Sequence, residues 1–271
     1  MQITSELFGN QLTLPDDEPP RIVSLVSSAT ETLFAIGAGE DVEGVSRYCG
    51  RFVDDLPAPV VGDYLTPDVA ALRHVDPDVV LVTAGAQRKV GRMLLDRGFP
   101  VYGLPLPNSL HGICDNIVLL GGLVDRVPAA RELAQRLQDE AADLRRDAPR
   151  QRPAVYAELW FGRFVRTTGG LSFIHDLLVT AGGDPVFAAD RRAYPIPDLD
   201  HVERVRPQFL LFHDEPEHPI NPLELVVERG WDRWSPPPKV IKGSVERGFN
   251  LIHDGPSWIE TARWLRRNFP G

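Results

Sequence analysis

The stretch YLTPDVAALRHVDPDVVLVT, residues 64–83, occurs again in altered form as YPIPDLDHVERVRPQFLLFH, residues 194–213. The two copies are offset by 130 positions (194 minus 64), and six positions are identical: Tyr64/Tyr194, Pro67/Pro197, Asp68/Asp198, Val75/Val205, Pro77/Pro207 and Leu81/Leu211. Each copy has the pattern of a tyrosine, a helix with proline in its first turn, a second proline that ends the helix, and a buried strand. We therefore predict an internal repeat and two similar lobes.

The segment RIVSLVSSATETLFAIGAG, residues 21–39, precedes the first copy and has its own pattern. Its apolar run at 22–26 predicts a buried strand, and the spacing of Ser28 and Glu31 predicts a capping box at the start of a helix. The glycines at its end favour a left-handed helix stop. We expect the amino end of this helix to face a ligand, because its free N–H groups can meet an acceptor.

Strand and helix patterns alternate in both halves, which is typical of parallel sheets covered by helices. The intervening segment VPAARELAQRLQDEAADLRRDAPRQRP, residues 127–153, places its apolar residues on one face of a helix. The sequence thus predicts an α/β fold of two Rossmann-like lobes with mainly parallel sheets, joined by one long interlobe helix. The expected division is 1–123, 124–150 and 151–271, with a ligand in the cleft at the carboxyl ends of the strands.

Charge and composition narrow the classes of partner. The chain has 271 residues and a formal net charge of −9, which disfavours binding to nucleic acid or to an anionic membrane. No apolar run has the roughly 18 residues that a membrane helix needs, and the first residues lack a secretory pattern. These features predict a cytoplasmic protein without membrane insertion, in which Cys49 and Cys114 are reduced thiols.

Several blocks together resemble the helical-backbone class (class III) of ABC-transporter substrate-binding proteins, whose fold is like a periplasmic binding protein. The blocks are RIVSLVSSATETLFAIGAGEDVEGVSRY, PDVAALRHVDPDVVLV, the interlobe helix, GLSFIHDLLVTAGGDPVF and YPIPDLDHVERVRPQFLLF. The likeness covers residues 10–268 and is greatest to members that bind cobalamin (vitamin B12). It implies a transport-related binding protein that has no cofactor of its own and binds cobalamin or another metal chelate as its ligand.

The resemblance also implies which residues contact the ligand, which in this family lies flat against aromatic and apolar side chains. Tyr48 follows GVSR, and Trp160 follows the strand AVYAEL, with Phe161 or Phe164 close behind. The loop GFNLIHDGP supplies further candidates near the carboxyl terminus. The implied ligand-binding residues are Tyr48, Tyr64, Trp160, Phe161, Tyr194, Phe249 and His253.

A second implied surface is the one that docks on the transporter. Family members that transport carry an acidic residue in each lobe, directly after the Tyr-x-x-Pro-Asp pattern. Here that position holds Asp200 in the second lobe but Ala70 in the first. An ABC permease is therefore a candidate partner with one of two charged contacts missing, and a non-exported corrinoid-binding protein is favoured over an exported receptor.

Alternatives exist for several residues. The segment FHDEPEHP, residues 212–219, is either a metal site or a plain acidic loop, and Cys49 either binds metal as a thiolate or packs. His253 is either an axial metal ligand or a solvated side chain. Trp231 and Trp234 form a lid, a patch for a partner, or an aromatic plug under a proline-rich loop.

The preferred function is a non-enzymatic corrinoid-binding protein. One alternative is a haem or ferric-siderophore receptor of an ABC importer. Another is an enzyme acting on a metal tetrapyrrole or siderophore, which requires His213, Glu215 and His253 to converge on one point.

Overall fold

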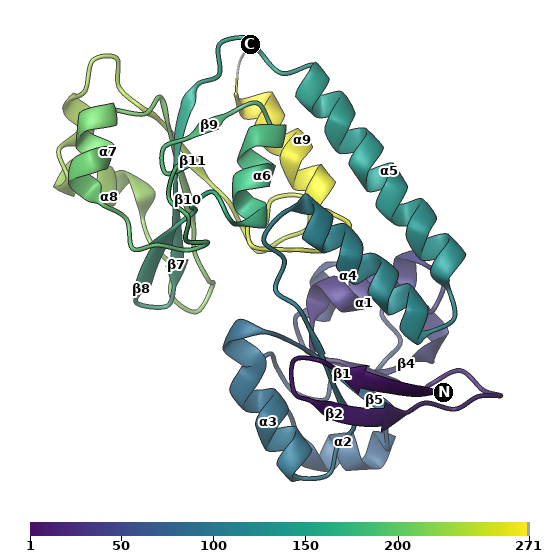
Figure 1. Ribbon diagram of the computed structural model, residues 1–271. Helices are drawn as coiled ribbons and strands as arrows, with labels where there is room; N and C mark the ends of the chain where they lie inside the picture. Colours follow the sequence, from purple (N-terminus) through teal and green to yellow (C-terminus); the bar gives the residue numbers. More distant parts are fainter. Residues whose placement is uncertain (270–271) are drawn as a thin grey trace. The chain divides into compact units, whose positions relative to one another are not determined.

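The computed structural model describes residues 1–269 and divides into two compact units (Figure 1). Unit 1 comprises Met1–Pro107, His111–Leu137 and Asp254–Pro256. Unit 2 comprises Asn108–Leu110, Gln138–His253 and the described residues from Ser257 onward. The division falls inside helix α5 (Val127–Arg146), whose 20 residues correspond to the predicted long helix.

Unit 1 is built on a four-stranded parallel sheet in the order β4-β3-β5-β6. Its strands are β3 (Ile22–Ser24), β4 (Val42–Val45), β5 (Val79–Thr83) and β6 (Val101–Leu104). Because β5 is central and buried along its whole length, its side chains alternate between two covered faces.

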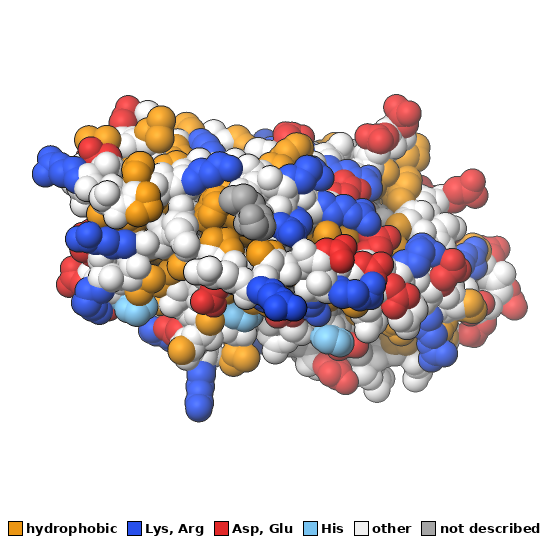
Figure 2. Space-filling view, turned by 90° about the horizontal axis from the view of Figure 1, so that it is seen from above, with side chains coloured by type: hydrophobic (Ala, Val, Ile, Leu, Met, Phe, Trp, Pro, Cys, Tyr) orange, Lys and Arg blue, Asp and Glu red, His pale blue; other side chains and the backbone are white. Residues whose placement is uncertain are grey.

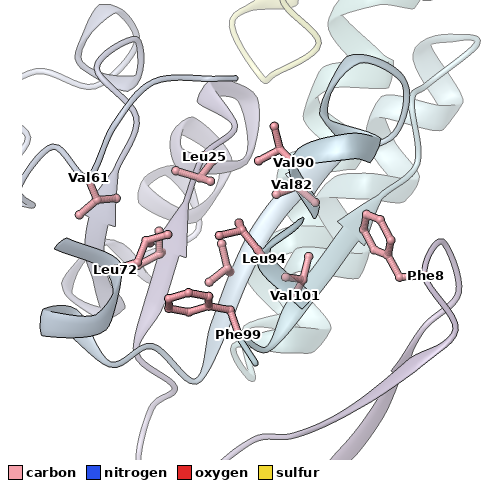
Figure 3. Packing of buried hydrophobic residues seen from close by; sticks show 11 residues of the cluster. Phe8, Leu25, Val61, Leu72, Val82, Val90, Leu94, Phe99 and Val101 are labelled. Atoms are coloured by element: carbon pink, nitrogen blue, oxygen red, sulfur yellow. The ribbon is translucent and has the colours of Figure 1, made fainter. Parts of the chain in front are cut away.

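Helices cover both faces of this sheet. One face carries α2 (Val69–Val75) and α3 (Arg88–Asp96), and their buried side chains pack in the apolar cluster shown in Figure 3. Its members from the sheet include Leu25, Val80 and Val82. The other face carries α1 (Ser27–Ala35) and α4 (Leu110–Leu123). The hairpin of β1 (Gln2–Ser5) and β2 (Asn10–Thr13) adds Phe8 to the apolar cluster.

Unit 2 contains a five-stranded sheet in the order β11-β10-β7-β8, with β9 paired to β7. Its strands are β7 (Ala154–Phe161), β8 (Phe164–Thr167), β9 (Asp184–Pro185), β10 (Phe209–His213) and β11 (Lys239–Lys242). All pairs are parallel except β7 with β8. One face carries α7 (Leu199–Val205) and α8 (Pro222–Glu228), and the other carries α6 (Phe173–Thr180) and α9 (Trp258–Asn268) (Figure 1).

The internal repeat is confirmed in its helices and strands. Helix α7 lies exactly 130 positions after α2, and β10 lies exactly 130 after β5. Asp68 and Asp198 cap the two helices through their carboxylates, and both helices end in left-handed residues, Asp76 with φ 52° and Arg206 with φ 51°. The predicted place of the first proline is wrong, because each proline precedes the capping aspartate and so lies outside the helix.

The capping box predicted for α1 is also wrong. The residue at its N-cap is Val26, which makes no side-chain capping bond, and the helix already begins at Ser27. The Val26 carbonyl accepts from both the backbone N–H and the hydroxyl of Thr30, so the first turn closes two residues earlier than predicted. Ser28 therefore lies within the helix. The glycine stop is confirmed, since Gly37 has φ 78° directly after the helix.

The surface mixes charges of both signs. On the face in Figure 2, blue basic and red acidic side chains alternate among apolar ones, without a large area of one sign. Within residues 1–269, no helix combines the length and apolar character needed to cross a bilayer.

Candidate functional site

In unit 1, two tyrosines lie where the parallel strands end. Tyr48 follows β4, and the Arg47 backbone N–H donates to the Gly62 carbonyl at 2.9 Å, which brings the loop of Tyr64 to the same strand end. Both tyrosines are half-buried. The carboxyl edge of a parallel sheet is the usual place for a ligand, so these two rings are available for contact.

The loop that carries Tyr64 is held by its own backbone and by Asp63. One carboxylate oxygen of Asp63 accepts from the N–H groups of Leu65 and Thr66, at 2.8 and 2.7 Å. Gly62 has φ 123°, and a Cβ there would lie 2.6 Å from the Cα of Pro67. Only glycine fits this turn, and the loop therefore presents Tyr64 from a fixed backbone.

The side chain of Gln87, fully buried, joins three segments at this edge. Its Nε2 donates to the carbonyls of Leu25 at 3.0 Å and Tyr64 at 2.8 Å, and its Oε1 accepts from the Thr83 N–H at 2.8 Å. A buried amide with three of its four bonds made is a strong positional constraint. Gln87 thus ties the Tyr64 loop to the ends of β3 and β5.

Positive charge surrounds Tyr48. The guanidinium carbon of Arg51 lies 4.9 Å from the ring centroid and that of Arg47 lies 5.9 Å from it, within cation–π range. Arg47 also pairs with Asp63 at 3.2 Å. The edge therefore combines an aromatic ring with two cations.

A narrow cavity of about 10 Å³, room for about one water molecule, lies at the start of α1. Ser28, Thr32, Thr83, Asn116 and Asp254 supply its polar lining.

Burial, reinforced by the Asp254 carboxylate, raises the pKa of the Tyr64 hydroxyl above its ordinary value. Tyr64 therefore remains a neutral hydrogen-bond donor at physiological pH.

The structure favours a packing role for Cys49. Its side chain is fully buried, with Sγ 3.1 Å from the Thr30 hydroxyl and 3.2 Å from the Ser46 hydroxyl. Neither Cys49 nor Cys114 forms a disulfide, and both are buried. Among residues 1–269, no group of three or more His, Cys, Asp or Glu side chains is arranged to hold a metal.

In unit 2, Trp160 and Phe161 end strand β7 and are half-buried. Because side chains alternate along a strand, they project to opposite faces of the sheet. Trp160 shares its face with Tyr156, which packs in the cluster under α7 and α8. Phe164, on the neighbouring strand, is 54% exposed.

Trp160 is held by a buried ion pair. Its indole N–H donates to Oε1 of Glu158 at 2.8 Å, and Arg229 binds both oxygens of the same carboxylate at 2.7 and 3.0 Å. Glu158 is fully buried, and the Arg229 side chain is 17% exposed. This places a charged pair inside an otherwise aromatic and aliphatic core.

The remaining predicted ligand contacts of unit 2 differ in exposure. Tyr194 is half-buried, in a segment pinned to β8 by the bond from the Thr167 N–H to the Pro195 carbonyl. Phe249 is 43% exposed, and its ring packs at 5.4 Å on Trp264. His253 is only 6% exposed, which contradicts the prediction that its side chain is solvated.

The side chains of the acidic segment 212–219 bind different partners and do not converge on one point. Asp214 pairs with Lys242 at 2.8 Å, and Glu215 accepts from the Gly162 N–H at 3.0 Å. His213 is fully buried at the end of β10, where neither ring nitrogen has a hydrogen-bond partner among the described residues. Its burial lowers the pKa of His213 to about 4, against the raising effect of Asp214. These contacts favour the plain-loop interpretation.

Two further predictions concern the tryptophan pair of unit 2 and the residues assigned to docking on a transporter. Trp231 and Trp234 are 2% and 6% exposed and stack at 5.3 Å, which confirms the aromatic plug. Asp200 and Ala70 are both exposed in the first turns of α7 and α2. Their assignment to docking stays a prediction.

Sequence reasoning missed Gln87, Arg229 and Asp254. Gln87 reaches carbonyls 23 and 62 residues away, and Arg229 reaches a carboxylate 71 residues away. Such separations leave no local periodicity. The one signal was Glu158, a charged residue within an apolar strand, which requires a partner.

The amino-acid sequence and the structure were both compared with those of known proteins, and both resemble periplasmic binding proteins. The family model described as periplasmic binding protein matches residues 22–233. The cobalamin-binding protein of Halobacterium salinarum is 28% identical over 203 residues, 73% of this chain and 54% of that protein. The chain thus spans about half the length of this curated relative.

Two further relatives cover more of their own length. A vitamin B12-binding protein of Vibrio cholerae is 23% identical over 251 residues, 92% of this chain and 84% of that protein. The crystal structure of S. aureus IsdE complexed with heme superposes with a TM-score of 0.78 at 20% identity, covering 94% of this chain and 100% of that one. At that identity the superposition establishes the fold alone.

Proposed function

Because the chain belongs to the periplasmic binding protein family, we propose that it is a non-enzymatic binding protein for a corrinoid. The observation that carries the proposal is its similarity, over 73% and 92% of its length, to proteins named for binding cobalamin or vitamin B12. Family membership establishes a substrate-binding class, and the corrinoid is the specific ligand that we add to it.

The proposed contacts are mainly aromatic side chains, which suit a large ligand with apolar faces. We assign contacts to Tyr48 and Tyr64 in unit 1, and in unit 2 to Trp160, Phe161, Tyr194, Phe249 and His253. Aromatic rings offer wide contact area at low entropic cost. The amide-rich rim of a corrinoid also suits neutral donors such as the Tyr64 hydroxyl.

The test is a titration of the purified protein with cyanocobalamin, cobinamide, haem and a ferric siderophore. Visible spectra and tryptophan fluorescence report binding. We expect saturable binding of the two corrinoids and weaker or no binding of the others. Stronger binding of haem or of the siderophore would replace the corrinoid with that alternative ligand, and no response to any of the four would overturn the proposal.

A substitution links this binding to the proposed residues. Tyr64→Ala should weaken corrinoid binding by about 1–3 kcal/mol, because it removes a half-buried ring from the contact. Leu223→Ala is the control, since Leu223 is 63% exposed on α8. Equal affinity of the Tyr64 variant and the control would remove Tyr64 from the site.

Partner and location extend the proposal. Asp200, exposed on α7, is the candidate contact to a basic surface of an ABC permease. The cytoplasmic location predicted from the sequence gains no support from a family of periplasmic binding proteins. We propose that the protein acts outside the cytoplasmic membrane, and fractionation of cells that express the natural gene tests this location.

A further inference from the structure

Strand β7 carries an unusual row of side chains on one face. Tyr156, Glu158 and Trp160 alternate along it and therefore point to the same side of the sheet. Tyr156 and Glu158 are fully buried, whereas Trp160 is half-buried. The row thus leads from the core outward to a proposed ligand-binding residue.

Each oxygen of the Glu158 carboxylate accepts two hydrogen bonds. Oε2 accepts from the Tyr156 hydroxyl at 2.5 Å and from Arg229 at 2.7 Å. Oε1 accepts from Arg229 at 3.0 Å and from the Trp160 indole at 2.8 Å. Burial and the Glu158 carboxylate raise the pKa of Tyr156, so its hydroxyl keeps the proton that it donates. Tyr156 and Arg229 therefore fix the position of the Glu158 carboxylate, and the carboxylate in turn holds the Trp160 indole through its N–H.

Stability alone gives no reason for this arrangement. Removing two charges from water costs free energy that their mutual attraction seldom exceeds, and apolar residues of similar volume usually serve as well. The matching place in unit 1 has that apolar solution, because Leu25 there follows β3 within the apolar cluster. What the ion pair adds is an acceptor for the indole N–H.

We infer that Glu158 and Arg229 are positioning residues, which hold the Trp160 indole in the orientation that contacts the ligand. The inference rests on the proposed function, since it takes Trp160 as a ligand contact. A side chain held before binding does not lose its rotational freedom on binding, and this is worth roughly two- to tenfold in affinity.

The chain contains a matched control. The indole N–H of Trp234 donates to both oxygens of Glu203 at 3.1 Å, so it is also held by a carboxylate. Trp234, however, is 6% exposed within the same cluster and lies in no proposed contact. Glu203→Gln should lower the melting temperature without changing the affinity for ligand.

The experiment is a mutant cycle in the full chain with cyanocobalamin as probe. The double variant Glu158→Leu/Arg229→Leu should bind roughly two- to tenfold more weakly, and it should have no further effect when combined with Trp160→Ala. Additive losses in the combined variant would overturn the inference, because the pair would then act without Trp160. So would wild-type affinity of the double variant alongside weakened binding by Trp160→Ala.

Two outcomes separate the inference from the function on which it rests. Absence of cyanocobalamin binding by the wild-type protein defeats the proposed function itself, and unchanged binding by Trp160→Ala removes the ligand contact that the inference assumes. If the double variant does not fold, Trp160→Phe replaces it, because that substitution keeps a ring and the intact ion pair but removes the indole donor. Wild-type affinity of Trp160→Phe would overturn the inference, and weakened affinity would support it.

Discussion

In unit 1, strand β3 and its continuation bury Val23 and Leu25 in a wholly apolar cluster, whereas the corresponding strand of unit 2 buries Tyr156 and the charged Glu158. The two strands have the same partners in the repeat, because Val23 pairs with Val80, and Tyr156 pairs with Leu210, which lies 130 positions after Val80. The difference teaches that one backbone arrangement accommodates either an apolar or an ionic core. The apolar core provides stability, and the ionic one provides stability together with a fixed hydrogen-bond acceptor.

The largest effect should come from exchanging these residues singly. Leu25→Glu would bury an unpaired carboxylate, at a cost of several kcal/mol that is comparable to the stability of a whole domain. Glu158→Leu would leave Arg229 unpaired and should cost about 3–5 kcal/mol. Urea denaturation followed by circular dichroism measures both, with Leu25→Met as the volume-conserving control. Near wild-type stability of Leu25→Glu would show that unit 1 also contains a counterion.

The next largest effect is a loss of stability at low pH. It comes from His213, which occupies in unit 2 the position that Thr83 occupies in unit 1. The folded state holds His213 neutral with a pKa of about 4, below its unfolded value of 6.5. The unfolded chain therefore takes up the proton first, and the stability from this residue is complete above pH 6.5 and lost as the pH falls toward 4. Between pH 7 and 5 the loss should be about 2 kcal/mol.

His213→Thr, which copies unit 1, should remove this part of the pH dependence. Urea denaturation at pH 7, 6 and 5 gives the slope, which separates the effect from any loss of packing that is the same at every pH. His218→Thr, at an exposed histidine of the same segment, is the control. An unchanged slope in the His213 variant would show that the pKa of His213 is the same in the folded and unfolded states.

The smallest expected effect is the difference in stability that the N-cap residues Asp68 and Asp198 give to α2 and α7. Asp68 accepts from two backbone N–H groups, at 2.9 and 3.1 Å, whereas Asp198 accepts from one, at 3.0 Å. Asp68→Ala should lower the free energy of unfolding by about 1 kcal/mol, and Asp198→Ala by less. Thermal denaturation of the two variants measures the order. The reverse order would mean that the second bond at Asp68 adds nothing.

The parts of the fold set by local pattern were predicted well. The repeat located α2, α7, β5 and β10, because prolines and apolar periodicity act over a few residues. The start of α1 was missed, since Ser28 has the right spacing for a cap but the first turn closes on Val26. The candidate ligand contacts came from the resemblance, and Gln87 and Arg229 act across distances in sequence that no local pattern encodes.

The last segment that unit 1 needs is Asp254–Pro256, which supplies one wall of its small cavity and the charge beside Tyr64. During synthesis, the ribosome must therefore produce nearly the entire polypeptide before the first unit has all its parts. A nascent chain that stops after residue 253 would carry a complete β4-β3-β5-β6 sheet and still lack the carboxylate of Asp254 beside Tyr64.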